Sequence, residues 1–193
     1  MKKYYLQAAG SCLLLTAILN PAVLLAADKE RRQFDAHEHG VTTLNIALDN
    51  NELVAELEGP AMNFIGFEHP PRTDEQKQAV TDTIALLKNN AQLIAANSAA
   101  ECTLLEANAE HVTDSDTHSD DHDDDHHDGA DESRHSEFVA EYQYRCDEPG
   151  KLSAITVGLF ERFPLTTEID TSFLGPDVQT FKKLTPNDPV LKL

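Results

Sequence analysis

The sequence is poor in positive charge. Its 193 residues include 15 lysines and arginines against 34 aspartates and glutamates, and the formal net charge is −19. This balance repels nucleic acid and anionic lipid surfaces, and it attracts cations. We therefore expect no nucleic acid among the partners of the chain, and we expect cations to be its ligands.

Long apolar runs are also scarce. The only substantial run covers residues 13–25, after two lysines and before two small residues, and it is short for a membrane span. This order of features is typical of a secretory signal peptide, so residues 1–27 are predicted to be removed by cleavage after Ala27. We expect the mature chain, residues 28–193, to form a single domain with no membrane insertion after signal cleavage.

Motifs of catalysis are missing as well. The sequence has no G-x-S-x-G, no H-E-x-x-H and no glycine-rich phosphate loop. Cys12 leaves with the signal peptide, and an even pair of cysteines in an exported protein indicates one structural disulfide, between Cys102 and Cys146. That pairing leaves no thiol nucleophile. We expect the protein not to be an enzyme, because nothing in the sequence marks a general base or a substrate pocket.

The apolar pattern predicts a mainly antiparallel sheet with one principal helix. Strands are predicted at residues 43–48, 53–57, 102–110, 137–146, 155–159 and 168–173. Thr73 is predicted to begin the helix, with Gln76 completing a capping box, and the helix should continue to about Lys88. The tail after residue 173 is predicted to be irregular. The fold class is therefore α+β.

The two mature cysteines predict a long hairpin. Antiparallel partners keep a constant sum of residue numbers, so a Cys102–Cys146 pair places Glu110 opposite Phe138. The segment between the two strands then becomes the loop of the hairpin, and the disulfide clamps its base.

That loop, residues 111–135, is the most unusual segment of the chain. It is dense in aspartate and glutamate, and it cannot bury enough apolar surface to offset the entropy of ordering, so we expect it to be disordered. Imidazoles and carboxylates bind divalent cations, which predicts several weak metal sites; the alternative is a solvated acidic loop that keeps the protein soluble. The candidate ligands are His111, His118, His122, His126, His127 and His135.

A tighter site is predicted at His37-x-His39, just before the first strand. In an extended segment the side chains at i and i+2 lie on the same side, so both imidazoles can converge on one ion. His69, in a proline-rich loop, is the candidate third ligand, and hydrogen bonding within that loop is the alternative. Glu68 and Glu161 are further candidate oxygen ligands. The predicted ion is Zn²⁺, although histidine-rich sites also suit Ni²⁺ and Cu²⁺.

Several short motifs occur in a characteristic order. AHEHG precedes a hairpin, GFEHPP precedes a helix, Cys102 and Cys146 flank the His/Asp-rich segment, and LFERFP is followed by LTPNDPVLKL. Over residues 36–193 the chain resembles the ZrgA family, the zinc-regulated periplasmic zinc-binding proteins of Gram-negative bacteria. The resemblance implies a periplasmic protein that binds scarce zinc and assists a zinc importer, such as a periplasmic ABC importer or its binding protein. It also implies that His37, His39 and the histidines of residues 111–135 handle the zinc.

Two other functions fit the same residues. A metal buffer or detoxification protein for Zn²⁺, Cu²⁺ or Ni²⁺ would have no delivery partner, and its loss would harm cells in excess metal rather than in scarcity. A structural module whose acidic loop binds calcium or a basic partner would depend on the aspartates and tolerate replacement of the histidines.

Overall fold

The computed structural model describes residues 38–89, 92–113 and 135–193. The predicted signal peptide, His37 and residues 114–134 of the His/Asp-rich segment lie outside these ranges. None of the helices in the described ranges is long and apolar enough to cross a membrane. The described elements are β1 (Val41–Asp49), β2 (Glu52–Pro60), α1 (Ala61–Ile65), α2 (Asp74–Asn89), β3 (Ile94–Ala96), η1 (Ser98–Ala100), β4 (Cys102–Thr113), β5 (Ser136–Cys146), η3 (Pro149–Lys151), β6 (Ala154–Val157), α3 (Leu159–Arg162), β7 (Glu168–Leu174), β8 (Gln179–Leu184) and β9 (Val190–Lys192).

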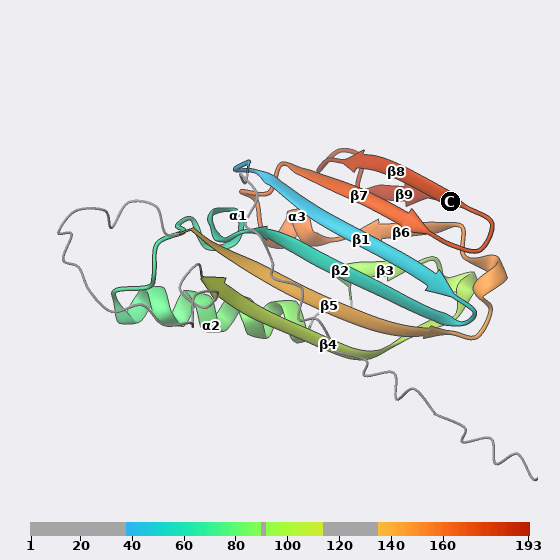
Figure 1. Cartoon of the computed structure of the whole chain (residues 1–193), viewed down its shortest axis with the longest axis horizontal. Coiled ribbons are helices and arrows are strands. Elements are labelled where there is room, and N and C mark those ends of the chain that lie inside the picture. The colour runs from blue at the N-terminus through green and yellow to red at the C-terminus, as the bar shows by residue number, and fades with distance from the viewer. Residues whose placement is uncertain (1–37, 90–91, 114–134) are drawn as a thin grey trace, which may run out of the picture. The chain divides into compact units, whose positions relative to one another are not determined.

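The strands form two sheets. The larger has the order β4-β5-β2-β1-β7-β8, and the smaller has the order β3-β6-β9 (Figure 1). Every neighbouring pair is antiparallel except β1 and β7, which run parallel. With α2 as its only long helix in the described residues, the protein has the predicted α+β fold.

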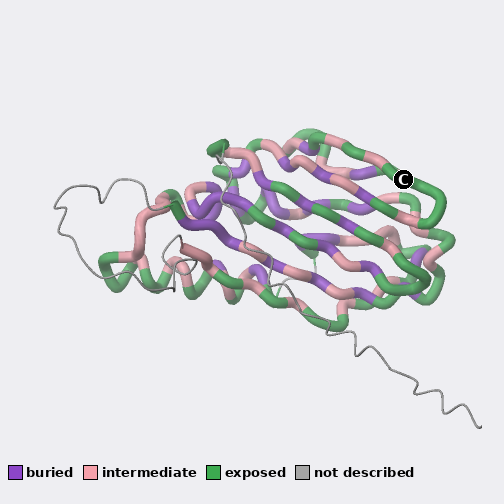
Figure 2. The backbone as a smooth tube through the Cα atoms, in the orientation of Figure 1, coloured by how far each residue is buried: buried purple, intermediate pink, exposed green. Residues whose placement is uncertain are grey.

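The core lies on one face of the six-stranded sheet. Along β1 and β2, buried and exposed residues alternate, as the period of two in a half-buried strand requires (Figure 2). On the covered face, Leu87 of α2 is fully buried, and the Tyr144 hydroxyl of β5 donates a hydrogen bond to the Ile94 carbonyl of β3 over 2.8 Å. Helix α2 and the smaller sheet therefore cover the same face.

The predicted capping box at the start of α2 is confirmed. The Gln76 amide donates to Thr73 Oγ1 over 3.2 Å, and the Thr73 amide donates to Gln76 Oε1 over 3.2 Å. The segment between β2 and this helix begins with the short helix α1. That short helix ends at Gly66, whose φ of 81° is the left-handed conformation that glycine adopts without steric cost.

Two expectations about the end of the chain are wrong. Leu159 begins the short helix α3 instead of ending a strand, and the tail contains β8 and β9. Strand β8 lies at the edge of the sheet and carries Lys182 and Lys183, so its apolar alternation is weak in the sequence. Strand β9 has only three residues and follows Pro189, so it leaves no recognisable pattern either.

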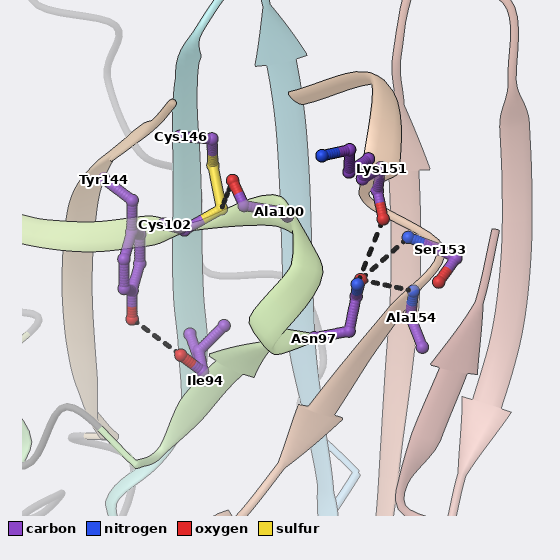
Figure 3. Close-up of a disulfide and its surroundings, with 9 residues drawn as sticks. All are labelled: Ile94, Asn97, Ala100, Cys102, Tyr144, Cys146, Lys151, Ser153 and Ala154. Atoms are coloured by element: carbon purple, nitrogen blue, oxygen red, sulfur yellow. Dashed lines mark hydrogen bonds between the residues drawn. A yellow bond between two sulfur atoms is a disulfide. The ribbon is translucent and has the colours of Figure 1, made fainter. Parts of the chain in front are cut away.

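The Cys102–Cys146 disulfide is confirmed, and the two cysteines are direct partners across β4 and β5 (Figure 3). The predicted register holds as far as Leu104 opposite Tyr144, and from Glu106 onward it is wrong by one residue. A bulge between Leu104 and Glu106 adds a residue to β4, so His111, not Glu110, lies opposite Phe138. The bulge thereby turns His111 to the face that carries the core.

Candidate metal site

Several segments far apart in the sequence meet at one end of the six-stranded sheet. Strands β1 and β5 begin at this end, whereas β2 and β4 end there, as the pairs Pro60–Glu137 and Thr113–Ser136 show (Figure 1). His39 lies two residues before β1, and His135 immediately precedes β5. Glu68 follows the end of α1 by three residues and lies at the same end of the sheet, because it contacts His39 and His135.

Glu68 contacts both of these histidines. One oxygen, Oε1, lies 3.0 Å from His39 Nε2, and the other, Oε2, lies 2.8 Å from His135 Nδ1. The Glu68 side chain is 10% exposed, whereas the side chains of His39 and His135 are 57% and 55% exposed. A nearly buried carboxylate therefore lies between two imidazoles that remain accessible from solvent.

The two oxygens of Glu68 differ in their bonding. Oε2 and His135 Nδ1 have hydrogen-bond geometry. Oε1 is buried and makes no hydrogen bond of regular geometry, even though His39 Nε2 is within 3.0 Å. A buried carboxylate oxygen without a hydrogen bond is costly unless something else satisfies it, and a cation is one such partner.

The local backbone fixes Glu68 and His135 to each other. The Ser136 hydroxyl, which is buried at the start of β5, donates to the Glu68 carbonyl over 2.7 Å. The loop after α1 is thus tied by its main chain to the residue that follows His135. This bond and the contact of the Glu68 side chain with His135 hold the carboxylate against the loop end of the β4–β5 hairpin.

The turn before β1 is fixed in a similar way. Gly40 has a φ of 88°, and a Cβ atom at this position would lie 2.7 Å from Thr167 Oγ1. Its carbonyl accepts hydrogen bonds from the Thr167 amide over 2.8 Å and the Glu168 amide over 3.0 Å. Glycine is required both by the conformation and by the close approach, so the turn that carries His39 has little freedom to shift.

The other predicted ligands lie elsewhere or outside the described residues. His69 makes contacts within its own loop: Nδ1 lies 3.0 Å from the Pro70 carbonyl oxygen, and the ring stacks on Phe67 with centroids 5.0 Å apart. His111 is half-buried, with its ring 5.0 Å from that of Phe138. Glu161 is exposed on α3. The ligands predicted outside the described residues are His37, His118, His122, His126 and His127.

Among residues 38–89, 92–113 and 135–193, no group of three or more His, Cys, Asp or Glu side chains is arranged so that it could hold a metal ion. In the site at Glu68, the two imidazoles contact different oxygens of the carboxylate, so the three side chains do not already surround one ion position. Of its three members, His39 and His135 were among the predicted ligands, and Glu68 was a secondary candidate. Sequence spacing alone could not bring these residues together, because 67 positions separate Glu68 from His135.

Comparison with known proteins places the chain in a family. A family model described as "ZrgA family zinc uptake protein" matches residues 36–193. This range includes all the described elements and the complete His/Asp-rich segment. A search of the curated proteins finds no match.

Proposed function

Because the chain belongs to the ZrgA family of zinc uptake proteins, we propose that it is a periplasmic zinc-binding protein that serves zinc import. In this proposal the His/Asp-rich residues 111–135 attract Zn²⁺, and a site formed by His39, Glu68 and His135 retains one ion. The ion then passes to a zinc importer or to the importer's binding protein. The protein binds and transfers the metal and performs no catalysis.

The observation that carries the folded-domain site is the spacing of His39 Nε2 and Glu68 Oε1. These atoms lie 3.0 Å apart without hydrogen-bond geometry. Ligand atoms around a tetrahedral zinc ion with bonds of about 2 Å lie roughly 3.3 Å apart. An imidazole nitrogen and a carboxylate oxygen, both common zinc ligands, are therefore already at nearly the spacing that the ion requires.

His135 supplies the third ligand of the proposed site. Its Nδ1 lies 2.8 Å from Glu68 Oε2, whereas His39 contacts the other oxygen, Oε1. Because both imidazoles are more than half exposed, they can rotate to close around an ion bound at the carboxylate. His37 lies two positions before His39 and is our candidate for the fourth ligand.

His135 connects the His/Asp-rich segment to the folded site at Glu68, so in this proposal an ion binds first to the segment and then to the folded site. His135 is the last residue of that segment and also touches Glu68. The carboxylates of residues 111–135 raise the local concentration of cations. An ion released from weak sites there is therefore close to the tighter site, whose third ligand belongs to the same stretch of chain.

Zinc titration by calorimetry tests the division between the two sites. The mature protein is compared with a variant in which a Gly-Asn-Gly linker replaces residues 114–134, so that His111 and His135 remain. We expect the variant to keep one tight site while the total stoichiometry falls. Loss of all binding would show that the folded domain holds no site. Replacing both His39 and His135 with Ala in the trimmed variant should abolish the tight site, and His69→Ala is the matched control that should retain it.

The uptake role is tested by growth. A strain lacking the protein should grow poorly when a chelator makes zinc scarce, and added zinc should restore growth. A defect that appears only in excess zinc would instead support the buffering function.

A further inference from the structure

We infer that Asn63 positions His39 for zinc binding, an inference that rests on the proposed zinc site. Asn63 lies in α1 and is 1% exposed. Its side chain forms hydrogen bonds with Gly40, the residue after His39, and with the first two residues of β1. Oδ1 accepts from the Gly40 amide over 2.7 Å, while Nδ2 donates to the Val41 carbonyl over 2.7 Å and to Thr42 Oγ1 over 3.1 Å.

With the Asn63 bonds, both the amide and the carbonyl of Gly40, the residue after His39, are hydrogen-bonded. The Gly40 carbonyl is held by the amides of Thr167 and Glu168, which enter β7. The Gly40 amide is held by Asn63, which comes from α1. The backbone beside the imidazole is therefore bonded on one side to the start of β7 and on the other to α1, and the Asn63 bonds connect it to the segment that leads to Glu68.

Helix α1 is itself fixed to the core. Phe64 packs against Phe138 and Phe163, with ring centroids 5.3 Å and 4.9 Å apart. Glu68 follows the end of this helix by three residues. The same five-residue helix therefore determines the position of both members of the pair, Glu68 through the covalent chain and His39 through the Asn63 side chain. The 3.0 Å distance between His39 Nε2 and Glu68 Oε1 depends on this common support.

A second asparagine provides a matched control. Asn97 also joins two segments through its side-chain amide: Nδ2 donates to the Lys151 carbonyl over 3.0 Å, and Oδ1 accepts from the amides of Ser153 and Ala154 over 2.8 Å and 3.2 Å (Figure 3). It lies near the disulfide, at the other end of the β4–β5 hairpin from His135. Replacing Asn97 with Ala removes a similar set of bonds without touching the proposed site.

The first test measures zinc affinity in the trimmed variant that lacks residues 114–134. Asn63→Ala should weaken binding at the tight site at least tenfold, whereas Asn97→Ala should leave the affinity unchanged. In a double-mutant cycle, Asn63→Ala should have little further effect once His39 is Ala, because the two substitutions act on the same ligand. An equal loss in both backgrounds would overturn the inference. If Asn63→Ala does not fold, Asn63→Ser takes its place with the same criteria.

The second test needs no zinc. Imidazole Cε1–H signals in the NMR spectrum of the zinc-free protein report the surroundings of each histidine. Asn63→Ala should move the His39 signal toward its value in a short peptide and leave the His69 signal in place. An unmoved His39 signal would refute the role of Asn63 whatever the zinc affinity. If His39→Ala alone binds zinc like the parent protein, the proposed site fails instead, and the NMR result still decides whether Asn63 positions His39.

Discussion

Glu68→Gln is the sharpest test of the proposed zinc site. Glutamine keeps the size of the side chain and one carbonyl oxygen, but it removes the negative charge that lies between His39 and His135. The comparison therefore isolates the charge of the carboxylate from its shape. Because the side chain is 10% exposed, water is poorly placed to replace what is lost.

The expected magnitude follows from the charges. A carboxylate oxygen bonded to Zn²⁺ at about 2 Å attracts the ion by about 4 kcal/mol even at the dielectric constant of bulk water. That free energy corresponds to an affinity ratio of about 1000-fold. The amide oxygen of glutamine recovers part of the loss, so we expect the tight site of the trimmed variant to weaken by about 100- to 1000-fold.

Competition with a chromogenic chelator measures affinities in this range. Glu161→Gln is the control, because Glu161 is an exposed carboxylate on α3 that makes no contact with the site in the described structure. Its substitution should leave the affinity unchanged. A change of less than tenfold for Glu68→Gln in a folded protein would refute direct coordination by Glu68.

Three predictions concern the stability of the fold. Replacing Cys102 and Cys146 with Ser should lower the free energy of unfolding in urea by about 4 kcal/mol, the chain-entropy value for a sequence separation of 44, and a loss below 1 kcal/mol would contradict it. Thr73→Ala should cost about 1 kcal/mol in thermal unfolding because the capping box is lost, and an unchanged melting temperature would argue against that bond. Burial raises the pKa of Tyr144 to about 12, so the folded state keeps the hydroxyl proton to a higher pH than the unfolded chain does. The corresponding stability is complete below pH 10 and is lost as the pH rises toward 12, and Tyr144→Phe should make that alkaline loss shallower in urea unfolding.

Much of the fold could be predicted from the sequence because local signals agree with tertiary structure there. The β1–β2 hairpin, the capping box at Thr73 and the disulfide each depend on a short pattern that packing reinforces. Strand β8 was missed because apolar and polar residues need not alternate in an edge strand. Its lysines form ion pairs with Asp188, Glu168 and Asp170.

The site was harder to predict than the fold. The H-x-H pattern indicated His39, but the sequence does not show whether Glu68 or His69 faces it, because this depends on the conformation of the loop after α1. The structure turns His69 toward Pro70 and Glu68 toward His39 and His135. The contact of His135 with Glu68 could not be predicted, because no local signal in the sequence indicates that this residue meets a loop 67 positions earlier.

The closure of the β4–β5 hairpin has a consequence for how this protein can evolve. Thr113 and Ser136 are direct partners, so the chain leaves and re-enters the sheet at adjacent points. Each doubling of the length of a flexible loop costs only about 0.6 kcal/mol in closure entropy. Under the proposed function, the number of histidines between Thr113 and His135 can therefore change with little cost in closure entropy, while His39, Glu68, His135 and Asn63 are constrained separately by the folded site. In that proposal, the capacity for metal and the affinity for a single ion are two properties that can change independently.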